Sequence, residues 1–157
     1  RIPTSENFAH VLWAKLAVQQ DIGTLHTLRL CEDEDLYAQV NAADGHEIAT
    51  VTKRYTFNAV QEGHQGRDWD CFVTIRGKID PATGMVTDIG ALDRLVQDAV
   101  IKPFNRQDLC QVLGSDTVSG EALTKTIWDR LVGKSSGGAL HNVRLVSNRD
   151  LFFDYAG

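Results

Sequence analysis

The chain of 157 residues repeats part of its own sequence, and the first copy is incomplete. Pro3 to Ala17 reads against Val118 to Val132, and Leu25 to Val40 reads against Leu140 to Tyr155, with the same offset of 115 positions and no gap. A helix-like segment and a strand-like segment recur in one register, which is typical of a repeated structural unit. The identical pairs include Glu6 and Glu121, Trp13 and Trp128, Leu16 and Leu131, His26 and His141, Arg29 and Arg144, and Leu30 and Leu145.

The offset predicts how the chain divides into units. Residue 1 corresponds to residue 116, so the first copy lacks the counterpart of roughly residues 54 to 115. We expect the C-terminal half of a first unit in residues 1–42, a linker in 43–50 and a complete second unit in 51–157. Either the missing part was lost upstream, as a possible companion fragment, or another chain completes the first unit.

Composition places the chain among ordinary globular proteins. Its residues are 43% apolar, 8% aromatic and 24% charged, which is enough to build a hydrophobic core. A net charge of −5 argues against nucleic acid as a partner, because binding to phosphates requires a basic face. The sequence has neither an apolar run of membrane-spanning length nor a signal-peptide pattern, so we expect no membrane association and a cytoplasmic location. Cys31, Cys71 and Cys110 are scattered and read as reduced thiols.

The periodicity of apolar residues gives an order of elements. We expect a helix from Thr4 or Ser5 to about Gln19, and a second helix from Ile89 to about Ile101 that Pro103 ends. A third helix is expected at 119–132, and strands at 25–32, 36–40, 51–60, 69–79, 142–148 and 151–155. The complete unit therefore reads ββααββ, an α+β plan in which two helices cover one face of an antiparallel sheet. Because such a sheet has open edges, we expect oligomerisation to close it into a barrel.

One stretch of the second unit carries a family resemblance. Residues 76–88 read RGKIDPATGMVTD, and Lys102-Pro103-Phe104 and Ser119-Gly120-Glu121 follow in order. This pattern resembles the 6-pyruvoyl-tetrahydropterin synthase and 6-carboxy-tetrahydropterin synthase family over nearly all of residues 54–157, and residues 1–40 resemble the C-terminal portion of that family. The resemblance implies a T-fold, homo-oligomeric rings (trimeric or hexameric, with fewer chains for a tandem protein) and a pterin-like small molecule bound at subunit interfaces.

The resemblance also implies a zinc ion held by three histidines, with an open fourth position for substrate. In this chain those places fall on Gln61, Gln65 and Arg67. A slipped alignment that uses Glu62 and His64 does not rebuild the set. We therefore expect zinc for the family but not from ligands in this chain.

The remaining family positions of the second unit are also changed. The loop that carries the nucleophilic cysteine in the family contains none here, and the Asp-His proton shuttle falls on Asn105-Arg106. The glutamate that anchors the pterin ring corresponds to Ser147. These losses predict a catalytically degenerate second unit, and we assign no catalytic residue in this chain.

The half-unit keeps its family residues. Residues 3–7 (PTSEN) match the helix-opening pattern that lines the pterin pocket in the family, and Glu32 falls on the pterin anchor. A carboxylate can accept two parallel N–H bonds from a 2-amino-4-oxo ring. We therefore predict Thr4, Ser5, Glu6 and Glu32 as pterin-binding residues. The alternatives are an ordinary helix cap for the first three and a solvated acidic turn for Glu32.

Two functions are consistent with these observations. In the first, the protein works in the pterin pathway as a zinc-dependent lyase of the synthase type, on a substrate like dihydroneopterin triphosphate, in a site completed by residues outside this chain. In the second, it is a non-catalytic T-fold pseudoenzyme that binds a pterin-like or purine-like ring or only scaffolds the oligomer.

Overall fold

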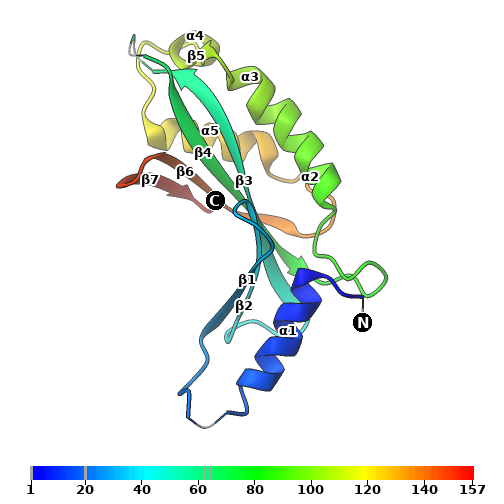
Figure 1. Ribbon diagram of the computed structural model, residues 1–157. Helices are drawn as coiled ribbons and strands as arrows, with labels where there is room; N and C mark the ends of the chain where they lie inside the picture. Colours follow the sequence, from blue (N-terminus) through cyan, green and yellow to red (C-terminus); the bar gives the residue numbers. More distant parts are fainter. Residues whose placement is uncertain (1, 20, 62, 64) are drawn as a thin grey trace.

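A single sheet runs through the computed structural model, which describes residues 2–19, 21–61, 63 and 65–157. Its strands follow the order β1-β2-β3-β4-β6-β7, and neighbours along this path pair antiparallel (Figure 1). A short strand, β5, pairs parallel with the end of β3. The strands are β1 (Thr27–Cys31), β2 (Leu36–Asn41), β3 (Ile48–Val60), β4 (Arg67–Lys78), β5 (Gln107–Asp108), β6 (Ala139–Asn148) and β7 (Leu151–Tyr155). The predicted α+β plan with an antiparallel sheet is confirmed.

The helices pack against this sheet in two groups. α1 packs on β1, β2 and β3, and α5 packs on β6 and β7 (Figure 1). The helical elements are α1 (Ser5–Leu16), α2 (Ile89–Val96), a π-helical segment η1 (Gln97–Ile101), α3 (Lys102–Phe104), α4 (Leu109–Leu113) and α5 (Gly120–Leu131). Each helix among the described residues is too short or too polar to span a membrane.

The core lies between the sheet and the helices. Alternate residues of the long central strands, such as Phe57 of β3 and Val73 of β4, are almost fully buried against Val96 of α2 and Ile127 of α5. Strand side chains alternate between the two faces of a sheet, so the residues between them face the other way. The opposite face of β3 and β4 accordingly carries polar residues such as Thr52 and Thr74.

The two repeated hairpins have the same register. Arg29 of β1 pairs with Gln39 of β2, and Arg144 of β6 pairs with Asp154 of β7. The outer edge of β2 pairs with β3, whereas that of β7 has no partner strand in the described part of the chain. The hairpin of the first repeat therefore extends the sheet of the second.

Several boundaries differ from those expected. α1 ends at Leu16 rather than near Gln19, and β3 begins at Ile48, inside the range expected as a linker. The second helix does not stop before Pro103 but continues through η1 and α3 to Phe104. Proline lacks an N–H, and it fits here because it lies in the first turn of α3. β5 and α4 were not expected.

Candidate functional site

The start of α1 is attached to the loop that follows β4. Thr4 caps the helix by accepting from the Asn7 N–H at 3.3 Å, and its Oγ1 donates to the Gly84 carbonyl at 2.5 Å. Glu6 is only 4% exposed. Its Oε1 accepts from the Val86 N–H at 3.1 Å, and its Oε2 accepts from the Ser5 hydroxyl at 3.2 Å. Thr4 and Glu6 thus join the first repeat to the second, and Ser5 bonds to Glu6. The contact of these three side chains with a pterin stays a prediction.

Glu32 lies in an acidic turn where its neighbours have structural partners. Asp33 accepts from the N–H groups of Asp35 and Leu36 at 2.7 and 2.8 Å, as in an Asx turn. Asp35 pairs with Arg54 at 2.7 Å. The exposed carboxylate of Glu32, by contrast, has no hydrogen bond or ion pair within the described part of the chain. Glu32 therefore differs from its neighbours in the turn, because no described residue bonds to its carboxylate oxygens.

Two of the positions expected to be degenerate, Gln61 and Arg67, lie where β3 ends and β4 begins, and their side chains bond within the chain. Arg67 donates from Nη1 to the Ser147 hydroxyl at 2.8 Å, and its guanidinium lies 5.3 Å from the Trp69 ring. Gln61 donates to the Val118 carbonyl. The bond between Arg67 and Ser147 joins two of the expected family positions that lie 80 residues apart in the sequence.

Asn105 and Arg106, the two residues that follow α3, bond to the end of β3. Asn105 accepts from the Asn58 N–H at 2.9 Å through its side-chain oxygen. The Arg106 N–H donates to the Asn58 carbonyl at 2.5 Å, with Arg106 at a φ of 60°. Gln65 is exposed. Both residues after α3 thus form backbone-positioning contacts rather than an acid–base pair.

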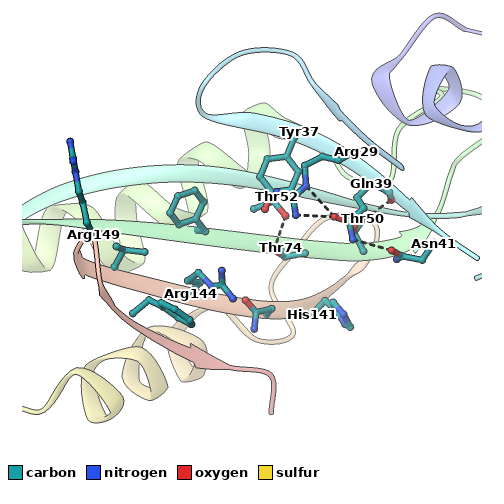
Figure 2. A pocket seen from close by; sticks show the side chains of 14 residues that line it. Arg29, Tyr37, Gln39, Asn41, Thr50, Thr52, Thr74, His141, Arg144 and Arg149 are labelled. Carbon is teal, nitrogen blue, oxygen red and sulfur yellow. Dashed lines mark hydrogen bonds between the residues drawn. The ribbon is translucent and has the colours of Figure 1, made fainter. Parts of the chain in front are cut away.

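Sequence reasoning missed a polar pocket on the face of the sheet opposite the core. It has a volume of about 530 Å³ and lies between the two repeated hairpins, with Arg29 and Tyr37 from one and Arg144 and His141 from the other (Figure 2). The available signal was the recurrence of Arg29 and His26 at Arg144 and His141. Arg29 alternates with the half-buried Leu28 and Leu30, and Arg144 alternates with the buried Val143 and Leu145, so both arginines point away from the core.

The comparisons with known proteins decide the family. The profile described as 6-pyruvoyl tetrahydropterin synthase matches residues 46–157, which is most of the chain. The chain belongs to the 6-pyruvoyl tetrahydropterin synthase family.

Individual relatives of this family agree with the match. A 6-pyruvoyl tetrahydrobiopterin synthase from Pongo abelii is 33% identical over 98 residues, which cover 60% of this chain and 67% of the relative. One from Poecilia reticulata is 28% identical over 126 residues, 77% of this chain and 73% of the relative. The structure of the Caenorhabditis elegans 6-pyruvoyl tetrahydropterin synthase superposes with a TM-score of 0.64 at 18% identity, over 70% of this chain and 96% of that one. This last likeness concerns the fold.

The residues at the expected zinc positions of this family member do not fit the metal. Arg67 has only donor groups and is bonded to Ser147, and the amides of Gln61 and Gln65 are not typical zinc ligands. Within residues 2–19, 21–61, 63 and 65–157, no three His, Cys, Asp or Glu side chains cluster as a metal site. The alternative ligands Glu62 and His64 lie outside the described residues.

Proposed function

We propose that this family member binds a pterin ring through Glu32, in a site of the first repeat that residues outside 1–157 complete. The observation that carries this proposal is the contrast between two equivalent positions. The exposed carboxylate of Glu32 has no partner among the described residues, whereas its counterpart Ser147 is bonded to Arg67. A carboxylate with free acceptor oxygens suits the paired N–H groups of a 2-amino-4-oxo ring. Thr4 and Glu6 support this site by holding the start of α1 in place.

The second repeat has a structural role in this proposal. Its family positions carry Gln61, Arg67, Asn105 and Arg106, of which three bond to the backbone or to Ser147 through side chains. An amide and a guanidinium cannot act as a general base near neutral pH. Lyase chemistry on a substrate like dihydroneopterin triphosphate would therefore require its catalytic groups and zinc ligands from outside this chain.

The same comparison of repeats supports assembly into a ring. Glu6 is buried because it meets Val86, while its counterpart Glu121 at the start of α5 is exposed. β2 is paired with β3, while its counterpart β7 has an open edge in the described part of the chain. We assign the start of α5 and the edge of β7 to an interface with a further T-fold unit, in a closed oligomer.

Pterin binding by the protein in its natural assembly tests the proposal. Fluorescence titration with a pterin should give an affinity that Glu32→Gln lowers by about 10- to 100-fold, because a hydrogen bond to a charged group contributes about 1.5–3 kcal/mol. Glu34→Gln is the matched control, since Glu34 lies in the same turn and its side chain is 95% exposed. Equal affinity for Glu32→Gln and wild type would refute the role of Glu32. An assembly that binds no pterin would favour the alternative, a scaffolding pseudoenzyme.

A further inference from the structure

The two repeated hairpins each hold one arginine in the same way, on the sheet face away from the core. The Arg29 guanidinium lies 4.2 Å from the centre of the Tyr37 ring, and the Arg144 guanidinium lies 4.5 Å from that of Phe152. Each arginine donates from Nε and Nη2 to the side chain opposite it on the next strand. For Arg29 the acceptor is Gln39 Oε1, at 3.1 and 3.0 Å. The stacking and the two bonds fix both guanidinium groups in place.

The two arrangements differ in charge. Arg144 donates to the Asp154 carboxylate at 2.8 and 2.7 Å, so its charge is neutralised. The amide oxygen of Gln39 fixes Arg29 without neutralising it. The Gln39 amide also donates to Asn41 at 3.0 Å, which orients its oxygen toward Arg29. Arg29 is therefore a fixed cation whose remaining N–H groups have no partner within the described part of the chain.

Both arginines border the pocket of about 530 Å³ between the hairpins, on the floor formed by β3 and β4 (Figure 2). The described residues that line it include Arg149 and His141 as well, together with threonine hydroxyls, and none is Asp or Glu. Asp44, which bonds to Asn41 beside the pocket, is paired with Arg76. In a chain with a net charge of −5, this pocket is a segregated basic region.

We propose that this pocket is a binding site for a phosphate-rich anion, with Arg29 as the charged contact. A guanidinium binds phosphate oxygens through parallel N–H bonds, and one fixed beforehand loses little side-chain freedom on binding. The hydroxyls of Thr50 and Thr74 and the Asn142 amide supply neutral groups around it. This site is separate from the proposed pterin anchor at Glu32 and does not depend on it.

The difference between the two hairpins provides a reciprocal test with inorganic triphosphate as the probe, measured by calorimetry on the natural protein. Gln39→Glu gives Arg29 a carboxylate partner, as Asp154 is for Arg144. This variant should bind triphosphate at least tenfold more weakly than wild type, with no fall in the melting temperature. Asp154→Asn keeps an acceptor for Arg144 but frees its charge, and it should tighten binding several-fold. Affinity should also fall as salt is raised.

The controls make the test specific to the pocket. Gln111→Glu on α4 is exposed and adds the same charge as Gln39→Glu away from the pocket, so it should leave triphosphate affinity within about twofold. Asp129→Asn on α5 is the corresponding control for Asp154→Asn, since Asp129 pairs with Lys125 on the surface. Absence of triphosphate binding to wild type, or equal effects of Gln39→Glu and Gln111→Glu, would overturn the proposal.

Discussion

Truncation of one leucine at equivalent places in the two repeats should have very different costs. Leu131 ends α5 and is 1% exposed, whereas its counterpart Leu16 ends α1 and is 37% exposed. Truncation of a core leucine removes buried methyl groups and leaves a cavity, at a cost of about 3 kcal/mol. Leu16 already contacts water, so its truncation leaves no closed cavity and should cost about 1 kcal/mol or less.

Thermal unfolding of Leu131→Ala and Leu16→Ala, followed by circular dichroism, measures this difference directly. For a chain of this length, each kcal/mol lowers the melting temperature by about 2–4 °C, so Leu131→Ala should melt about 6–12 °C below wild type. Leu16→Ala should melt within about 4 °C of it. Equal losses for both variants of the isolated chain would refute the reasoning, because they would mean that residues of this chain already cover that face of α1.

Two further predictions concern buried positions of the second repeat. Gly120→Ala should destabilise the fold by about 1–3 kcal/mol, because an added Cβ would lie 2.1 Å from the Phe153 ring. Gly45→Ala is the control in the same denaturation assay, because an added Cβ there would have no atom within 4 Å. Burial raises the pKa of the Cys71 thiol from 9.0 to about 12, so the native state keeps a proton that the unfolded chain loses at lower pH. Stability should therefore fall as the pH rises from 9 toward 12, with a smaller fall in Cys71→Ala, and at pH 8 a thiol reagent should label the exposed Cys31 but reach Cys71 only after unfolding. Rapid labelling of native Cys71 would contradict this burial.

The sequence was sufficient for the order of the main elements because their signals are local. Alternating apolar residues predicted both hairpins. Asp88 and Ser119 each cap a helix with a side-chain oxygen, which is typical of Asp and Ser directly before an apolar periodic segment. The same local logic placed the helix end before Pro103 and missed β5, which forms only because its two residues meet the end of β3. Short elements of this kind depend on tertiary contacts rather than on propensity.

The contacts of the candidate site were harder to predict from the sequence than the order of the elements. Glu6 reads as a first-turn acid of a helix, and its partner Val86 is eighty positions away, so its burial could not be inferred from local pattern. The bond between Arg67 and Ser147 spans the same separation. The family resemblance singled out Glu32, and the repeat offset places it opposite the uncharged Ser147. The pocket at Arg29 was missed, although the same offset pairs Gln39 beside Arg29 with Asp154 beside Arg144.

A crystal structure of the assembled protein with a bound pterin would test the central claim most directly, because that claim places the ring at Glu32 of the first repeat. The account predicts the amino and ring N–H groups of the pterin within hydrogen-bond distance of the Glu32 carboxylate, with the second unit's Arg67 and Ser147 still bonded to each other. A pterin held at the Arg67 end of the second repeat, with Glu32 still free in solvent, would contradict it.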